Sequence, residues 1–209
     1  MRKFSRICVK KYYNLLLSKV PSTKKTYLCK KYWSMDSFKT LVQQRRSHRR
    51  FTGEPVSGDD VKLILRSALM SPTSKGLRAW QFVVVDEKNY LLRLSDAKSM
   101  GSSFLSGAAL VVAVLGDDRM NDCWVEDASI AAFAMQLQAE DLGLGSCWVQ
   151  IRGRATGDGE SSEDIVRGIL DIPANLRVLC LVAFGHAADE RKPQDETRLK
   201  WEQVHVEKY

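Results

Sequence analysis

The sequence contains no long hydrophobic run. Its longest, at residues 108–115, is far shorter than the roughly 18–20 apolar residues of a membrane span and suits a buried strand. The leucines at residues 15–17 are followed by Lys19 and Pro21 before they reach the length of a signal-peptide core, which argues against secretion. Glycine (13) and proline (5) are too few for a collagen-like or low-complexity chain of 209 residues. With 44% hydrophobic residues, the composition is that of one globular domain able to bury a core.

Paired cysteines and the common catalytic motifs are also missing. The five cysteines form no Cys-x-x-Cys pair, which argues against a zinc site or a redox dithiol, and their odd number favours reduced thiols in a cytoplasmic protein. The histidines His48, His186 and His205 show no metal-ligand spacing, so no metal site is predicted. The sequence has no Gly-x-Gly-x-x-Gly, Walker, His-Glu-x-x-His or Gly-x-Ser-x-Gly motif, which removes the enzyme classes that depend on them.

Negative charge is absent from the first 34 residues. They contain ten Lys and Arg and no Asp or Glu, while the whole chain carries +7, which leaves −3 for residues 35–209. The basic balance therefore belongs to a leader and predicts neither nucleic acid nor a membrane as a partner of the domain that follows. The leader at residues 1–34 can be a targeting or nucleic-acid arm, a membrane-surface segment, or a stretch outside the working protein. We favour the last, with translation starting at Met35.

Helical and extended patterns alternate from Met35 onward. Ser57 is a predicted N-cap, with Asp60 three residues later, and Asp122 is predicted to open the longest helix, whose alanines indicate close packing. A polar, glycine-rich loop follows at 153–161, and the apolar tail at 197–209 needs a surface to cover. Helices are predicted over residues 36–46, 58–70, 90–94, 123–142 and 162–170, and strands over 80–85, 109–115, 146–151 and 177–184.

Residues 45–51 carry four arginines and a serine where the first predicted helix ends. Cations at a helix C-terminus complement the macrodipole and contribute roughly 0.3–1 kcal/mol each, which is a sufficient structural explanation. Guanidinium groups and a hydroxyl are also well suited to hold a phosphate. These residues alone leave both interpretations open.

Two other segments have the composition of ligand-binding loops. The polar loop at residues 71–79 leads from a helix into a strand, and its small residues let backbone amides approach a flat ligand, with Lys75 or Arg78 adding charge. The glycine-rich junction at residues 142–148 leads from the longest helix into the next strand. Each segment is weak evidence alone, since the second is also an ordinary glycine C-cap.

In this order and spacing, the segments resemble the FMN-dependent nitroreductase family, from near Met35 to the end of the chain. In that family an Arg-x-Ser-x-Arg element and a late basic pair hold the flavin phosphate, and a Pro-Ser/Thr segment ending in Trp follows the next helix, matched here up to Trp80. The chain departs from the frequent Asn-x-Gln-Pro pattern at residues 76–79, which leaves substrate preference open. By this resemblance the cofactor-binding residues are Arg45, Arg46, Ser47 and Arg49; Pro72, Thr73, Ser74 and Lys75; Trp148, Val149 and Gln150; and Arg191 and Lys192.

The resemblance implies an α+β fold in which helices flank a central, mostly antiparallel sheet, and a homodimer with FMN at its interface. NADH or NADPH would reduce the flavin, and a nitro compound, a quinone or a similar small acceptor would reoxidise it in a ping-pong cycle. A cation near N1 and O2 of the flavin favours reduction, and Arg49 is the first candidate and Lys75 the second. No catalytic side chain is predicted, since solvent can supply the protons.

Two alternatives stay open. A protein with the same flavin fold can carry out another reaction, as a dehydrogenase, a dehalogenase or an enzyme of flavin breakdown. The other alternative is a non-catalytic basic binding module, and the net charge of −3 on residues 35–209 counts against it.

Overall fold

The computed structural model of this chain describes residues 38–209. The chain divides after Asp36, and the unit Ser37–Tyr209 contains all the elements that follow. The predicted leader at residues 1–34 and the predicted start at Met35 lie outside the described residues and stay predictions. Within the described part, no helix is both long enough and apolar enough to cross a membrane.

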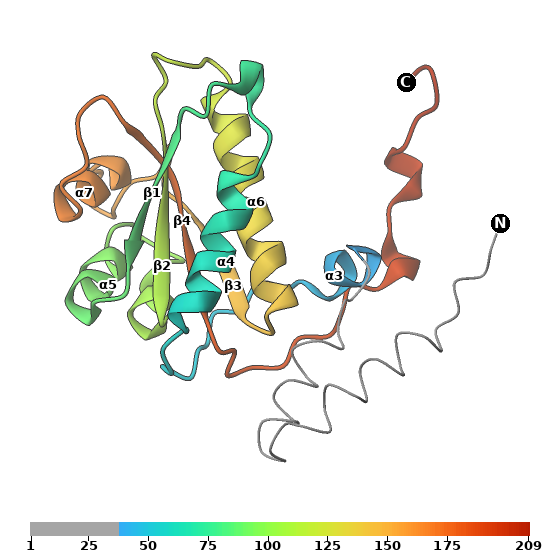
Figure 1. Cartoon of the computed structure of the whole chain (residues 1–209), viewed down its shortest axis with the longest axis horizontal. Helices are drawn as coiled ribbons and strands as arrows, with labels where there is room; N and C mark the ends of the chain where they lie inside the picture. The colour runs from blue at the N-terminus through green and yellow to red at the C-terminus, as the bar shows by residue number, and fades with distance from the viewer. Residues whose placement is uncertain (1–37) are drawn as a thin grey trace, which may run out of the picture. The chain divides into compact units, whose positions relative to one another are not determined.

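A four-stranded antiparallel sheet forms the centre of the fold (Figure 1). Its strands lie in the order β1-β2-β4-β3, so β3 is an edge strand beside β4. Every residue of β2 is buried, in agreement with its uninterrupted apolar sequence. The strands are β1 Trp80–Val85, β2 Leu110–Gly116, β3 Gly145–Gln150 and β4 Arg177–Gly185.

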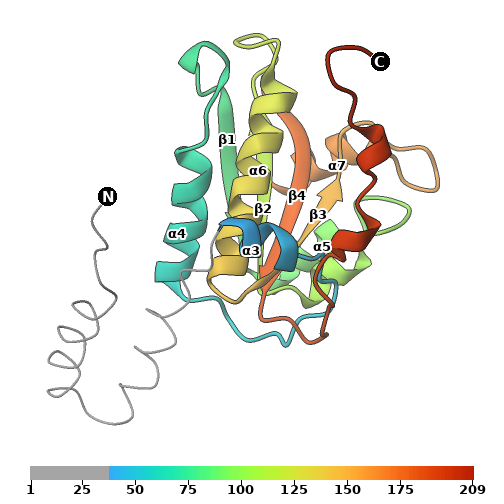
Figure 2. The same cartoon turned by 90° about the vertical axis from the view of Figure 1, so that its right-hand side faces the viewer.

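Helices cover both faces of this sheet (Figures 1 and 2). The helices α4 and α6 share a buried cluster with one face, in which Ile64 and Met135 are fully buried. The helices α5 and α7 share a second cluster with the other face, through Leu94 and Val166. The fold is therefore the predicted α+β arrangement. The helices are α3 Phe38–Gln44, α4 Gly58–Leu69, α5 Lys88–Ser95, α6 Trp124–Asp141 and α7 Ser162–Ile169, and the 3₁₀ turns are η1 Ser74–Gly76, η2 Ser103–Gly107, η3 Glu196–Arg198 and η4 Trp201–Gln203.

Local sequence signals explain how α4 and α6 are placed. The Ser57 hydroxyl accepts a hydrogen bond from the backbone N–H of Asp60 at 3.1 Å, which confirms the predicted N-cap of α4. Four alanines of α6 are buried, which confirms the predicted close packing: Ala128, Ala131, Ala132 and Ala139. Gly116 ends β2 against the first turn of α6, where a Cβ would lie 2.6 Å from Cε3 of Trp124. No side chain fits there, so glycine is needed where β2 meets α6.

Several helix boundaries differ from the sequence prediction. The first helix stops at Gln44, so Arg45 and Arg46 lie beyond it instead of inside it. The longest helix begins at Trp124 with Cys123 in the N-cap position, and the prediction that Asp122 opens it was wrong. The helix α5 extends beyond the predicted residues 90–94 on both sides, since the polar residues at its ends hide its boundaries in the sequence.

The C-terminal segment leaves β4 and runs beside α3, on the outer side of α6 (Figures 1 and 2). The backbone N–H of Gln194 donates to the carbonyl of Gln43 at 2.8 Å, and Lys39 pairs with Glu196 at 3.5 Å. Further along, Trp201 is 71% exposed. The apolar tail therefore keeps large side chains uncovered within a single chain.

Candidate functional site

The arginine-rich segment after α3 lies against the chain that follows β4. The two segments are separated by about 140 residues in sequence, and backbone pairing joins them, including a bridge between Phe51 and Ala187. The structure thus brings the predicted cluster of Arg45, Arg46, Ser47 and Arg49 together with Arg191 and Lys192. We call these six residues the basic cradle. The joining hydrogen bonds run from Thr52 N to His186 O (3.0 Å), Ala188 N to Arg50 O (2.9 Å), Gln194 N to Gln43 O (2.8 Å) and Arg46 Nη1 to Lys192 O.

The start of β3 is fixed to the same cradle. Ser47 forms a bridge with Ser146, and the backbone N–H of His48 donates to the carbonyl of Ser146 at 3.0 Å. A Cβ at Gly145 would lie 3.0 Å from the Cβ of His48 and 3.1 Å from that of Ala187. Glycine at 145 therefore lets the segment after α3, the segment after β4 and the strand β3 meet at one point.

The cations of the cradle have few acidic partners. Among residues 38–209, Arg45, Arg46 and Arg49 form no ion pair with a carboxylate. The guanidinium of Arg49 lies 6.0 Å from the ring centroid of Phe104, in cation–π range. The macrodipole of α3 does not account for this clustering of arginines, because α3 has only seven residues and Arg49 lies five residues beyond its end. Positive charge gathered without compensation favours an anionic ligand.

The thiol of Cys147, on β3, lies close to the cradle residues Arg45, Ser47 and Arg49. Burial raises its pKa, and the nearby guanidiniums of Arg49 and Arg45 and a hydrogen bond with Ser47 oppose the increase only in part. The thiol is therefore neutral near pH 7. A neutral, buried thiol is a poor nucleophile, so this cysteine is a packing residue.

One carboxylate connects two segments of the cradle. Oδ1 of Asp189 lies 2.9 Å from Nδ1 of His48, and Nε of Arg191 donates to Oδ2 of Asp189 at 2.7 Å. Burial acts to raise the pKa of Asp189, but the hydrogen bond from His48 and the charge of Arg191 outweigh it and lower the pKa. The carboxylate is therefore ionised, and Nδ1 of His48 donates to it. The sequence alone assigns His48 no site role and does not point to Asp189.

The predicted cofactor-binding residues Trp148, Val149 and Gln150 lie on β3, which leads away from the cradle. Val149 is buried, while Trp148 and Gln150 are half-buried, with Nε1 of Trp148 donating to Oε1 of Gln150 at 3.0 Å. Since β3 is an edge strand, and Ser47 forms a bridge with it at Ser146, no further strand among the described residues pairs with its outer edge beyond that bridge.

Lys98 contacts the strand that carries these predicted residues, and the sequence interpretation did not include it. Its Nζ donates to the carbonyl of Gln150 at 3.3 Å, at the end of β3. Burial, with the charge of Arg154, lowers its pKa. A lysine between two serine-rich turns carries no recognisable signal in the sequence.

The predicted loop at Pro72, Thr73, Ser74 and Lys75 does not reach the cradle of its own chain. The backbone N–H of Ser74 donates to the carboxylate of Asp127, in the first turn of α6, at 2.9 and 3.1 Å from the two oxygens. The cradle meets the chain just beyond the other end of α6, at Gly145. An 18-residue helix is about 27 Å long. The structure therefore separates two groups of predicted site residues.

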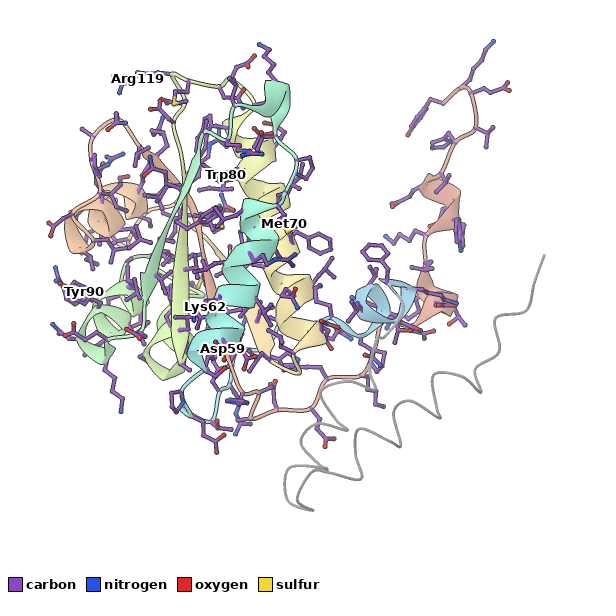
Figure 3. All side chains as sticks on the ribbon, viewed as in Figure 1. Asp59, Lys62, Met70, Trp80, Tyr90 and Arg119 are labelled. Carbon is purple, nitrogen blue, oxygen red and sulfur yellow. The ribbon has the colours of Figure 1, made fainter. Side chains whose placement is uncertain are left out.

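The loop itself is held in an unusual conformation. Lys75 and Arg78 have positive φ values of 53° and 51°. Such values are uncommon for residues with a Cβ and occur where surrounding contacts hold them. The carboxylate of Asp127 is 5% exposed and also accepts from Nδ2 of Asn121 at 2.7 Å. Trp80, which follows the loop, is a core residue that packs with Phe82 between the sheet and α4 (Figure 3).

The comparisons with known proteins agree with this geometry. The model of the nitroreductase family matches residues 42–101 and 92–186. An FMN-dependent nitroreductase structure from Clostridium difficile R20291 is 39% identical, with a TM-score of 0.79, over 81% of this chain and 98% of that chain. A protein of the NADH dehydrogenase/NAD(P)H nitroreductase type from Archaeoglobus fulgidus is 29% identical over 84% of this chain and its own full length. An NADPH-dependent oxidoreductase from Staphylococcus aureus is 24% identical over 81% of this chain and 72% of its own length. The chain belongs to the nitroreductase family.

Proposed function

We propose that this protein is an FMN-dependent oxidoreductase that takes hydride from NADH or NADPH and passes electrons to a small acceptor such as a nitro compound or a quinone. The observation that carries the proposal is the basic cradle, in which guanidiniums from segments distant in sequence meet beside the edge strand β3. The names of the relatives support the same cofactor and electron donors. Its buried thiols at Cys147 and Cys180 suit a reducing compartment, and we propose the cytoplasm.

The donor set of the cradle fits the phosphate of FMN. A phosphate monoester carries nearly two negative charges near pH 7 and accepts several hydrogen bonds. Arg45 and Arg46 supply guanidinium groups without acidic partners among the described residues, and Ser47 adds a hydroxyl. A dinucleotide, by contrast, has no glycine-rich helix N-terminus to bind in this sequence. A single phosphate group is the simpler match to the cradle.

In the proposed site the chain positions the cofactor and adjusts its charge. FMN, when bound, accepts hydride from the nicotinamide and gives electrons to the acceptor. Arg45, Arg46, Arg191 and Lys192 hold the phosphate, and the edge of β3 at Val149 and Gln150 orients the ring. Arg49 places its positive charge beside the ring, where it stabilises negative charge that develops on reduction, as Lys75 of a second copy would from the other side. No side chain needs to act as a general acid.

We further propose that the site is completed in a homodimer. The loop at Thr73–Lys75 lies at the opposite end of α6 from the cradle, so a second copy can bring its loop to the cradle-bound ligand. Exposed apolar side chains favour such a partner: Phe38 on α3, Phe133 on α6 and Trp201 in the tail are 70%, 44% and 71% exposed. These residues lie on the α3 and α6 side of the molecule, where the tail also runs (Figure 2).

The absorbance spectrum of the purified protein tests the cofactor. We expect a yellow protein with a flavin band and about one FMN per subunit, bleached by NADH or NADPH and restored by an acceptor. A panel of nitroaromatics, quinones and oxygen then distinguishes the proposed reaction from others of the same fold. A colourless protein that gains no absorbance with added FMN would overturn the proposal.

A further inference from the structure

The carboxylate of Asp189 occupies an unexpected place for an acid, inside a cluster of cations. Its side chain is 12% exposed, and each of its two oxygens has its own partner, Nδ1 of His48 at 2.9 Å and Nε of Arg191 at 2.7 Å. An acid beside a phosphate site repels the ligand unless its charge serves another purpose. One oxygen of this carboxylate bonds to Arg191 of the cradle and the other to His48, between Ser47 and Arg49, which indicates a role in positioning the two segments.

The hydrogen bond between Asp189 and Arg191 occupies only one N–H group of the guanidinium, the one on Nε. A guanidinium has five N–H donors in a rigid plane, and Asp189 engages only the one on Nε. The donors on Nη1 and Nη2 are left for a ligand. Arg191 is 43% exposed in its side chain, so without this anchor it would populate many rotamers. The carboxylate therefore fixes the direction in which the remaining donors point.

The bond to His48 connects Asp189 to the other wall of the cradle. His48 stands between Ser47 and Arg49, and its backbone N–H is held by Ser146 at 3.0 Å. The backbone N–H of the adjacent residue Ala188 donates to the carbonyl of Arg50, which holds the segment of Asp189 beside the segment of His48. Through one side chain, the structure thus sets the spacing between the arginines after α3 and the arginine after β4.

We propose that Asp189 is a positioning residue that makes the cradle selective for a flavin carrying a terminal phosphate, FMN, over riboflavin, which lacks one. The inference rests on the proposed FMN-dependent function. Asp189 acts through Arg191 and the His48 segment and does not touch the ligand. Riboflavin has the same ring and ribityl chain but does not need the aligned guanidinium, so its binding is independent of Asp189.

The test measures the Kd of FMN and of riboflavin for the flavin-free protein by quenching of flavin fluorescence. In Asp189→Asn we expect the Kd of FMN to rise about tenfold, the equivalent of one charge-assisted hydrogen bond, and the Kd of riboflavin to stay within about twofold. Asp195→Asn is the matched control, because Asp195 lies in the same C-terminal segment and bonds only to Thr197 among the described residues. It should leave both values unchanged.

A second pair of variants identifies the side chain through which Asp189 acts. In an Arg191→Gln background, Asp189→Asn should raise the Kd of FMN less than it does in the unmodified chain, because the bond between Asp189 and Arg191 is already lost and only the bond to His48 remains to be removed. Equal weakening of FMN and riboflavin, or no weakening of either, would overturn the inference while leaving FMN binding by the unmodified protein intact. If the unmodified protein binds no flavin, the proposed function itself is wrong and the inference is overturned with it.

Discussion

The two ends of α6 carry two different kinds of ligand-binding structure. At the C-terminal end, the basic cradle is joined by backbone hydrogen bonds among three segments: the one after α3, the one after β4, and the start of β3. At the N-terminal end, the loop around Ser74 is fixed by the single buried carboxylate of Asp127 and contains residues with positive φ. The cradle is assembled by the fold as a whole, whereas the loop depends on one side chain. Changes of charge or packing in any of the three segments should therefore weaken the cradle, whereas the loop should respond mainly to a change at Asp127.

The largest expected effect on flavin binding comes from removing Arg49, a cation of the cradle that pairs with no carboxylate among the described residues. Arg49→Ala should raise the Kd of FMN about 10- to 100-fold and slow flavin reduction, because a positive charge beside the flavin ring is lost. Flavin fluorescence quenching and stopped-flow reduction by NADPH measure the two effects. Arg50→Ala is the control, since Arg50 is the exposed neighbour of Arg49 and its backbone carbonyl, not its side chain, accepts the hydrogen bond from Ala188. If Arg49→Ala and Arg50→Ala change the Kd of FMN and the reduction rate equally, the two arginines attract the flavin only through their overall charge, and Arg49 has no specific position beside it.

A change of packing tests whether the meeting of the three segments is needed for the cradle. Gly145→Ala places a Cβ 3.0 Å from His48 and 3.1 Å from Ala187, so one segment must move. We expect a loss of about 1–3 kcal/mol in the free energy of unfolding and weaker binding of FMN. Gly157→Ala is the control, since a Cβ there meets nothing within 4 Å. Thermal unfolding that is equal for the two variants would show that the segments adapt without cost.

The loop responds to a change at Asp127. Asp127→Ala leaves the buried amide of Asn121 and the N–H of Ser74 without their acceptor, which should cost about 1–3 kcal/mol of stability. Turnover should fall about tenfold as the loop shifts, while the ratio of the riboflavin and FMN Kd values, which reports on the phosphate, should not change. Glu126→Gln, on the exposed side of the same helix turn, is the control. A changed ratio would mean that the conformation of the loop affects how the cradle binds the phosphate.

The sequence predicted the elements of the fold well because their signals are local. Alternating and periodic hydrophobicity located all four strands and the helices that cover them, and Ser57 marked the start of α4. The arginine cluster was visible because its members are neighbours in the chain. That these residues meet Arg191 and Lys192 followed from the family resemblance, and the structure shows how backbone pairing achieves it.

Other parts of the site depend on contacts that no local pattern encodes. Asp189 and His48 are 141 positions apart, and Lys98, which follows α5, bonds to Gln150, 52 positions later at the end of β3. The separation of the Ser74 loop from the cradle is a consequence of the length and direction of α6. Such relations appear only once the chain is folded.

A mixed dimer tests most directly the claim that two copies build each site from opposite ends of α6. Arg49→Ala and Asp127→Ala chains, each with low activity as homodimers, are combined with different affinity tags and the heterodimer is isolated. If the site is shared, one of its two sites is unmodified, and the heterodimer should recover about half of the wild-type activity and bind FMN tightly at that one site. A heterodimer no more active than its parents would show that each chain serves its own site, and would contradict the account.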